Sequence, residues 1–293
     1  MTRSHSALSE RLAEPTPLLL DGATGTELER RGAATSAPLW SAHALIERPD
    51  LVRDIHAEYL AAGAELLTAN TFRTQRRTLE RGGREESAAT LTALATRLAR
   101  QAVEASALGR QIFVLGSAPP LEDCYRPDLV PDDEALAREH AEHAANLAES
   151  GVDAILVETM NTIREANIAV RAASETALPV WVSFACDASA RLLSGEKLGD
   201  ALTAIAAARP DAILVNCLPL SRVGACLPIL RQCRLPFGVY ANLGEPIEAG
   251  RTEAAAPREF AAAAATWRDA GARILGGCCG TTPAHIAAIA AVL

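Results

Sequence analysis

Residues 154–184, AILVETMNTIREANIAVRAASETALPVWVSF, contain the unit that decides the fold. The stretch opens with the apolar run Ala154–Val157 and closes with the apolar run Val180–Phe184. Such continuous apolar runs are typical of strands buried on both faces of a parallel sheet. Between them the residues follow the 3.6-residue period of an amphipathic helix. The stretch therefore predicts a strand, a crossover helix and a second, parallel strand.

The same alternation repeats along the chain. Longer helical patterns occupy Glu85–Leu108 and Asp132–Ser150; Asp132 can begin the second helix and Gly151 can end it. Pro283 lies where a last helix would begin. The apolar runs that we interpret as strands are Leu18–Leu20, Glu65–Thr68, Ile112–Leu115, Ala154–Val157, Val180–Phe184, Ala212–Val215, Gly238–Tyr240 and Ala272–Leu275. Eight such units normally close on themselves, so we predict an α/β fold with a single (β/α)8 TIM barrel.

The composition limits the size and the partners of the protein. The chain has 293 residues, 49% of them hydrophobic, and no change of composition marks a second domain. We expect a flexible segment over residues 1–16 and one barrel domain over residues 17–293. The formal net charge of −8 argues against a nucleic-acid partner, because an acidic surface repels phosphate. The first residues contain no apolar run that could serve as a secretory signal, and no stretch is long enough for a membrane helix, so we expect a cytoplasmic protein.

The residues that follow the predicted strands point to a functional site. In a barrel of this kind the chemistry lies at the carboxyl ends of the strands. The residues at these positions are small and polar, or able to bind a metal: Asp21-Gly22, Asn70-Thr71, Ser117, Glu158-Thr159, Cys186-Asp187, Asn216-Cys217, Asn242 and Cys278-Cys279. Strand ends border loops, which accounts for serine and asparagine but poorly for the cysteines.

Three of the seven cysteines form a candidate metal site. Cys278 and Cys279 follow the eighth predicted strand, and the glycines that flank them allow a tight turn. Cys217 follows the sixth strand, two positions away around a barrel. Three sulfurs suit Zn2+ and leave its fourth position open, as in catalytic zinc sites. A strained disulfide between the adjacent cysteines, or plain packing, is the alternative. We expect the other cysteines, Cys124, Cys186, Cys226 and Cys233, to pack or to lie in loops.

These motifs together resemble the homocysteine S-methyltransferase family. The resemblance extends from Leu18 to Ile289 and rests on the motifs Asp21-Gly22-Ala23-Thr24-Gly25-Thr26, Thr68-Ala69-Asn70-Thr71-Phe72, Glu158-Thr159, Asn216-Cys217 and Gly276-Gly277-Cys278-Cys279-Gly280-Thr281-Thr282-Pro283. It implies that Cys217, Cys278 and Cys279 bind zinc and that the sulfur of homocysteine takes the fourth position. It also implies that Glu158 and the Asp21-Gly22 turn hold the amino-acid end of homocysteine. Ala69 departs from the threonine or serine of some family members, so one polar contact is expected to be missing.

Each candidate substrate contact has a structural alternative. A carboxylate at a strand end faces the pocket, so Glu158 can pair with the substrate ammonium; the alternative is an ion pair with Arg164. Asp21 can orient the same ammonium or cap a turn.

Further contacts are expected nearby. Thr24 opens the first predicted helix, whose amides can receive a carboxylate. Asn216 is a further candidate contact, and Asn242 either binds the substrate or closes a turn.

The expected reaction is an in-line displacement at a methyl carbon. Zinc would deprotonate the acceptor thiol, whose ordinary pKa is about 8.5, and the product would be methionine. The chain is too short for folate or cobalamin domains, so we favour S-methylmethionine or S-adenosylmethionine as the donor. A betaine-type donor is less favoured, because we place Trp40, Trp181 and Trp267 in core or helix positions.

Other readings lead to different functions. The same zinc site could methylate another thiol or a selenol. A Schiff-base aldolase needs a lysine on a strand, and Lys197, the one lysine of the chain, is predicted in a loop or helix start. A non-catalytic zinc scaffold would need a fourth protein ligand.

Two loops and one helix complete the predictions. The proline-rich segment Ser117–Pro131 is a candidate lid, with a rigid connector as the alternative, and Asp187–Gly199 is a candidate wall of the donor side. His140 and His143 lie three residues apart on a predicted outer helix, where we expect them to be solvated rather than to bind a metal.

Overall fold

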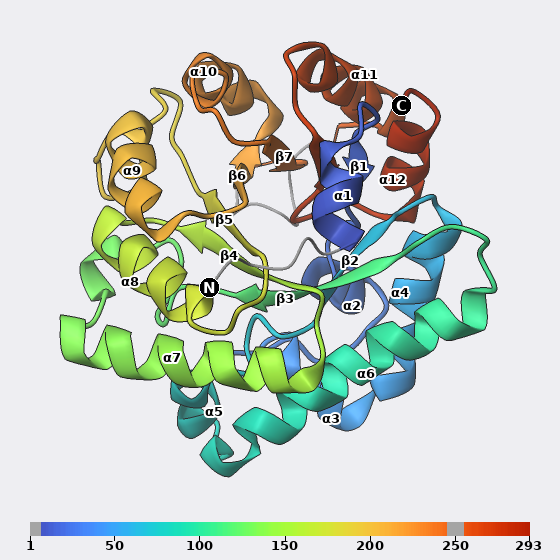
Figure 1. Ribbon diagram of the computed structural model, residues 1–293. Coiled ribbons are helices and arrows are strands. Elements are labelled where there is room, and N and C mark those ends of the chain that lie inside the picture. Colours follow the sequence, from blue (N-terminus) through green and yellow to red (C-terminus); the bar gives the residue numbers. More distant parts are fainter. Residues whose placement is uncertain (1–6, 245–254) are drawn as a thin grey trace.

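The computed structural model, which describes residues 7–244 and 255–293, contains the predicted barrel (Figure 1). All eight strands are parallel, in the order β1-β8-β7-β6-β5-β4-β3-β2. The ring closes between β1 and β2, where Leu20 forms an isolated parallel bridge with Leu66. The strands are β1 (Leu18–Leu19), β2 (Leu66–Ala69), β3 (Phe113–Ala118), β4 (Ala154–Met160), β5 (Val180–Phe184), β6 (Ala212–Pro219), β7 (Phe237–Asn242) and β8 (Ile274–Gly277).

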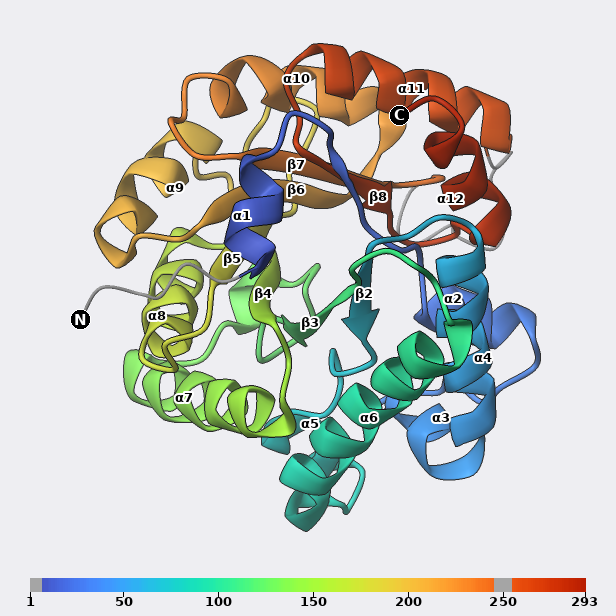
Figure 2. The same ribbon diagram turned by 45° about the vertical axis from the view of Figure 1, so that its right-hand side comes forward.

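Helices follow the strands and cover the outside of the barrel (Figures 1 and 2). They are α1 (Ala7–Ala13), α2 (Gly25–Arg30), α3 (Ala42–Glu47), α4 (Pro49–Ala61), α5 (Arg76–Arg81), α6 (Ala88–Ser106), α7 (Asp133–Ser150), α8 (Ile163–Ser174), α9 (Leu198–Ile205), α10 (Leu220–Leu230), α11 (Pro257–Asp269) and α12 (Pro283–Ala290). The predicted ends of α7 are confirmed, because Asp132 caps its first turn and the left-handed Gly151 ends it. No helix within the described ranges is long and apolar enough to cross a membrane.

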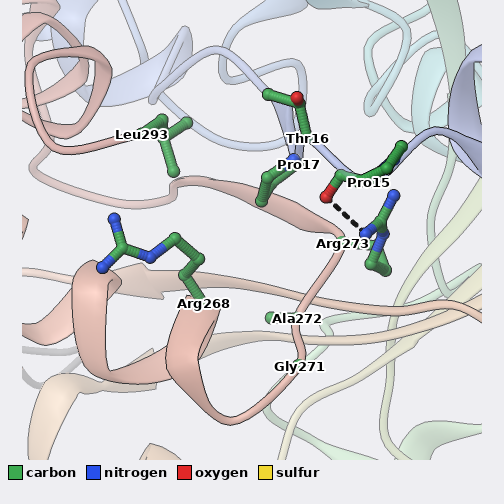
Figure 3. Close-up of a pocket in the computed structure, with 8 residues that line it drawn as sticks. All are labelled: Pro15, Thr16, Pro17, Arg268, Gly271, Ala272, Arg273 and Leu293. Carbon is green, nitrogen blue, oxygen red and sulfur yellow. Dashed lines mark hydrogen bonds between the residues drawn. The ribbon is translucent and has the colours of Figure 1, made fainter.

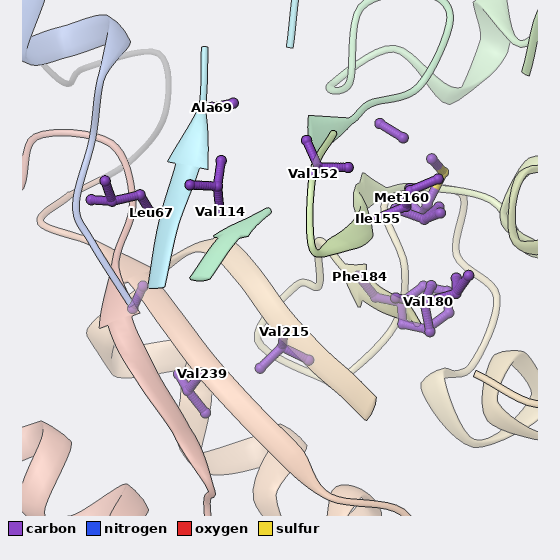
Figure 4. Close-up of a cluster of buried hydrophobic side chains, with 14 of the residues drawn as sticks. Leu67, Ala69, Val114, Val152, Ile155, Met160, Val180, Phe184, Val215 and Val239 are labelled. Carbon is purple, nitrogen blue, oxygen red and sulfur yellow. The ribbon is translucent and has the colours of Figure 1, made fainter. Parts of the chain in front are cut away.

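The apolar residues of the strands form two layers. Alternate side chains point to opposite faces of a strand, so Leu18 and Leu20 fill the barrel while Leu19 faces the helices. The inner cluster includes Phe113 and Trp181, which confirms the core position predicted for that tryptophan. Figure 4 shows part of the outer cluster, in which strand residues such as Val215 meet the surrounding helices. Both layers consist of buried apolar side chains, so the barrel is a packed scaffold rather than a pore.

Helix α1 covers the end of the barrel at which the strands begin (Figure 2). Its Leu8 and Leu12 are buried in the inner cluster, and Arg11 forms an ion pair with Glu65 at the start of β2, with an N–O distance of 3.0 Å. Residues 7–13, which belong to the segment expected to be flexible, thus form a helix with two buried leucines, and the flexibility of residues 1–16 stays a prediction. Residues 1–6 lie outside the described residues, and the domain boundary stays a prediction.

A hollow of about 350 Å³ lies at this same end of the barrel (Figure 3). It lies between the segment before β1 and the turn that joins α11 to β8, where Arg273 donates a hydrogen bond of 2.5 Å to the carbonyl of Pro15. Neither a cysteine nor an acidic side chain lines it. The chemistry predicted from the sequence therefore lies at the opposite end.

Candidate active site

Two strand ends carry residues with left-handed backbones. Pairing between β6 and β7 is irregular between Asn216 and Pro219, and Cys217 in this bulge has a φ of 54°. A similar irregularity in β4 leaves Thr159 with a φ of 59°. Such backbones cost about 1–3 kcal/mol each and persist only where the surrounding structure holds them. The Asn216 side chain holds Thr159 in this conformation, since it accepts from the Thr159 amide at 3.1 Å and donates to the Thr159 hydroxyl at 2.8 Å.

The turn after β8 brings two more cysteines to the same place. The amide of Cys279 donates to the Asn242 side-chain oxygen at 3.0 Å, which fixes the turn to the end of β7. Gly277 cannot be replaced without a clash, because a Cβ there would lie 2.4 Å from the hydroxyl oxygen of Thr281. Cys278 and Cys279 are thus held at the rim from two sides.

The three sulfurs form one cluster. The Sγ atom of Cys217 lies 3.1 Å from that of Cys278 and 3.9 Å from that of Cys279. Sulfurs around a tetrahedral Zn2+ ion, at about 2.3 Å from the metal, would be about 3.8 Å apart, so the cluster has the right size. All three thiols are free, and within the described residues they are the one group of three side chains that could hold a metal. A disulfide between the adjacent cysteines is therefore not formed.

The environment concentrates negative charge on Cys217. Hydrogen bonds from Cys278 and Cys279, together with those from the hydroxyls of Tyr125 and Thr159, hold the pKa of Cys217 well below its ordinary value. The pKa values of Cys278 and Cys279 are raised, because their protons are shared with Cys217. The donor set is therefore electron-rich and suits a borderline-soft cation.

The other cysteines lie outside this cluster, as expected. Cys124, Cys186 and Cys226 are buried, and Cys233 is half-buried beyond the end of α10.

Two acidic side chains line the pocket beside the cluster. Asp21 accepts hydrogen bonds from the amide and the hydroxyl of Thr68, at 2.8 and 3.1 Å. Glu158 accepts from the hydroxyl of Ser117 and, at 3.1 Å, from that of Tyr240. Burial raises the pKa of Glu158 to about 7. Burial also raises the pKa of Asp21, against the two Thr68 hydrogen bonds, and the nearby charge of Glu158 adds to the effect.

Neither carboxyl group is paired with a cation in the described part of the chain. The alternative partner of Glu158, Arg164, instead pairs with Asp133 at 2.8 Å. Buried carboxylates without a counter-ion are costly, so Asp21 and Glu158 form a place for a positively charged ligand group.

A pocket of about 590 Å³ joins these groups. Its wall includes the predicted residues Asp21, Gly22, Thr24, Glu158, Cys217, Cys278 and Cys279. Asn216 and Asn242 are not among its lining residues, and they hold Thr159 and Cys279 instead. A direct substrate contact of Asn216 or Asn242 therefore stays a prediction. Binding of a carboxylate by the backbone amides at the start of α2 also stays a prediction.

Several lining residues were not expected from the sequence. Trp40 was placed in a core or helix position, but its ring lines the pocket and meets Phe72 edge-on, with centroids 6.1 Å apart. Arg73 and Tyr125 also line the pocket. The motif Thr68–Phe72 could have indicated that Phe72 lies at the pocket. Trp40 lies in an irregular segment, where no periodic pattern indicates its position.

The Ser117–Pro131 segment is tied down by buried side chains. Gln75 donates to the carbonyl of Pro120 at 3.0 Å, Glu165 accepts from the amide of Leu121 at 2.8 Å, and Asn161 donates to the carbonyl of Cys124 at 2.8 Å. These contacts favour the rigid connector over the mobile lid. They also fix Tyr125 beside Cys217.

His140 and His143 are buried beneath this segment, so the expectation that they are solvated is wrong. The ring of His140 lies 3.2 Å from Glu165, and that of His143 lies 3.1 Å from the carbonyl oxygen of Ser117. Burial lowers the pKa of His143 to about 4, so it is neutral and donates to that carbonyl. Both histidines support the loop and lie apart from the cysteine cluster.

The Asp187–Gly199 segment does not line the pocket, contrary to the expectation. Its Glu196 accepts from the amide of Ile163 at 2.9 Å instead, which ties the segment to the start of α8. Lys197 precedes α9 and is likewise absent from the lining, which removes the aldolase alternative.

Comparison with known proteins identifies relatives over nearly the whole length. Residues 18–293 match the sequence model of a family described as homocysteine S-methyltransferase. The homocysteine S-methyltransferase of Escherichia coli (strain K12) is 36% identical, with 94% of each chain covered. Homocysteine S-methyltransferase YbgG of Bacillus subtilis (strain 168) is 33% identical, with 94% of this chain and 93% of the relative covered. The structure of the metallated form of homocysteine methyltransferase MmuM from Escherichia coli superimposes with a TM-score of 0.82 at 31% identity, over 98% of this chain and 99% of that one.

Proposed function

The chain belongs to the homocysteine S-methyltransferase family, and from this premise we propose which metal, which methyl donor and which residues this enzyme uses. It transfers a methyl group to homocysteine, a small-molecule acceptor. We propose that the transfer depends on Zn2+ held by Cys217, Cys278 and Cys279. The observation that carries the proposal is the convergence of three free thiols on one point of the pocket wall. The metallated form of a relative adds support.

Zinc bound there would lower the pKa of the homocysteine thiol so that the acceptor reacts as a thiolate. The protein's own sulfurs keep that thiolate nucleophilic, because three anionic ligands leave the site electron-rich. The scaffold alternative needs a fourth protein ligand, and the group of described residues that could hold a metal has three members. Three protein ligands would leave the fourth coordination position of the metal open, which favours a catalytic site.

Asp21 and Glu158 are proposed to bind the ammonium group of homocysteine. Both line the same pocket as the cysteines, and both lack a cationic partner among the described residues. An ammonium placed between them would receive charge-assisted hydrogen bonds in a dry site, where such bonds are strong. The hydroxyls of Ser117 and Tyr240 hold the Glu158 carboxylate in position. The acceptor would thus be fixed at its sulfur end and at its amino-acid end.

The donor is proposed to be a small cation, with S-methylmethionine or S-adenosylmethionine favoured. The faces of aromatic rings attract cations, and Trp40 and Phe72 line the same pocket as the cysteines. Because Trp40 lines the pocket, an aromatic ring is available to a quaternary ammonium group, and a betaine-type donor stays the alternative. Another thiol or a selenol remains the alternative acceptor, and the cytoplasmic location remains a prediction.

The test incubates zinc-loaded protein with homocysteine and each of S-methylmethionine, S-adenosylmethionine and betaine, and measures the methionine formed by mass. We expect methionine from a sulfonium donor and loss of activity after the zinc is removed with a chelator. Restoration by added zinc would support the metal assignment. Full activity in protein shown to contain no metal would refute it, and methionine from betaine alone would reverse the donor preference.

A further inference from the structure

We propose that Arg73 binds the carboxylate of the methyl donor and so restricts the enzyme to donors that carry one. The proposal rests on the proposed function, because it concerns the second substrate of the same pocket. Two arginines, Arg73 and Arg81, line this pocket. Arg81 is paired with Glu122 at 2.6 Å, whereas Arg73 forms no ion pair within the described residues.

One donor atom of the Arg73 guanidinium lacks an acceptor in its surroundings. Its Nε atom is buried and has no hydrogen-bond partner in the described part of the chain. A buried donor without a partner is costly, and the cost is higher for a charged group. The guanidinium lies over the ring of Phe72, with its central carbon 5.2 Å from the ring centroid. This contact fixes the plane of the guanidinium but satisfies none of its N–H groups.

The position of Arg73 matches the donor and not the acceptor. It lies over the ring of Phe72, which in turn meets Trp40 edge-on, and these two rings are the proposed site of the donor cation. Asp21 and Glu158, the proposed ammonium site of the acceptor, lie after β1 and in β4 and contact other groups. A zwitterionic donor would place its cation against the rings and its carboxylate on the guanidinium. A planar guanidinium binds a carboxylate through two parallel hydrogen bonds, which also fixes the direction of the donor.

The contact has a defined kinetic consequence. The carboxylate of such a donor keeps its charge while the methyl group leaves, so Arg73 binds the ground state and the transition state equally. Uniform binding of this kind lowers KM without changing kcat. A donor without a carboxylate meets an unpaired cation instead and is disfavoured, which is how charge selects against a wrong substrate.

The experiment compares two donors with zinc-loaded full-length protein at saturating homocysteine. S-methyl-L-methionine carries a carboxylate, and trimethylsulfonium carries the same methylated sulfur without one. In Arg73→Gln we expect the KM for S-methyl-L-methionine to rise by about ten- to hundredfold with kcat within about twofold, and the KM for trimethylsulfonium to stay or fall. Arg73→Lys should recover part of the loss, since it keeps the charge but not the planar fork. Arg76→Gln changes an arginine that pairs with Glu142 outside the pocket lining; it is the matched control and should leave the KM for both donors unchanged.

Several outcomes would overturn the proposal. An equal change for both donors, a change confined to kcat, or an unchanged KM for S-methyl-L-methionine in Arg73→Gln would each do so. If the wild-type protein transfers no methyl group from either donor, the donor assignment of the proposed function has failed. S-methyl-L-methionine is then titrated calorimetrically into homocysteine-saturated wild-type and Arg73→Gln protein. Weaker binding by the variant alone supports the role of Arg73, and equal or undetectable binding by both refutes it.

Discussion

Replacing Glu158 with glutamine should weaken homocysteine binding and change the number of protons that binding releases. The pKa of the Glu158 carboxyl is about 7, so about a tenth of it is ionised at pH 6 and about nine-tenths at pH 8. An incoming ammonium requires the ionised form. Binding at pH 6 should therefore release about one proton more from the wild-type protein than from Glu158→Gln, because the variant has no carboxyl proton to lose at this position.

The affinity change can be estimated in the same way. Removing one partner of a buried, hydrogen-bonded charge pair costs about 2–5 kcal/mol, so at pH 8 the variant should bind homocysteine at least about 30-fold more weakly. Calorimetric titration of zinc-loaded protein in two buffers with different heats of ionisation gives both the affinity and the proton count. Glu29→Gln, which removes an exposed carboxyl at the pocket wall, is the control. Equal proton release by wild type and Glu158→Gln would refute the assignment.

The same substitution should stabilise the metal-free protein at high pH. The pKa of Glu158 is raised above its ordinary value of 4.5, so ionising this carboxyl costs folding free energy. The cost is absent below pH 4.5, grows between pH 4.5 and 7, and is complete above pH 7, where it amounts to about 3 kcal/mol. Urea denaturation should show Glu158→Gln more stable than wild type at pH 8 and nearly equal to it at pH 5. A gain of the same size at both pH values would show that the effect does not come from ionisation.

Three further substitutions test other parts of the site and scaffold. Cys278→Ala removes one of three sulfurs, so the protein should lose its zinc on dialysis, as measured by elemental analysis, and with it all turnover; full activity would contradict the metal site. Tyr125→Phe removes a hydrogen bond to the Cys217 sulfur. A hydrogen bond to a charged group is worth about 1.5–3 kcal/mol, so the zinc affinity measured in a competition assay should fall about tenfold or more. An unchanged affinity would show that the hydroxyl is dispensable. Leu8→Ala opens a cavity at the closed end of the barrel and should cost about 2–5 kcal/mol of unfolding free energy with kcat/KM unchanged, whereas an unchanged melting temperature would show that α1 does not seal the barrel.

The sequence predicted the parts of this protein that depend on local pattern. All eight strands lie where the apolar runs placed them, because a strand buried on both faces must be apolar along its length. The convergence of Cys217 with Cys278 and Cys279 followed from the fold, since carboxyl ends of parallel strands meet at one rim. The burial of Asp21 and Glu158 at the same rim followed from the same rule, whereas their lack of cationic partners could be seen only in the structure.

The errors arose where distant segments decide the environment. Nothing local to Trp40 indicates that an irregular segment folds back over the pocket. The histidines of α7 could have been placed correctly, because Leu136, His140, His143 and Leu147 follow each other at helical spacing on one buried face. The prediction gave more weight to the polarity of these side chains than to their spacing, and the Nε2 atom of each ring contacts a residue about 25 positions away in the chain.

One side chain, Asn216, links the two ends of the acceptor site. It directly precedes Cys217, it clamps Thr159, and its amide nitrogen lies 3.5 Å from a Glu158 oxygen. The Asn216 side chain therefore connects the sulfur cluster with Glu158, so it helps to fix the distance between the two ends of the proposed acceptor site. Under the proposed function, cysteine, which is one methylene shorter than homocysteine, is expected to reach only one of the two anchors and so to be the poorer acceptor.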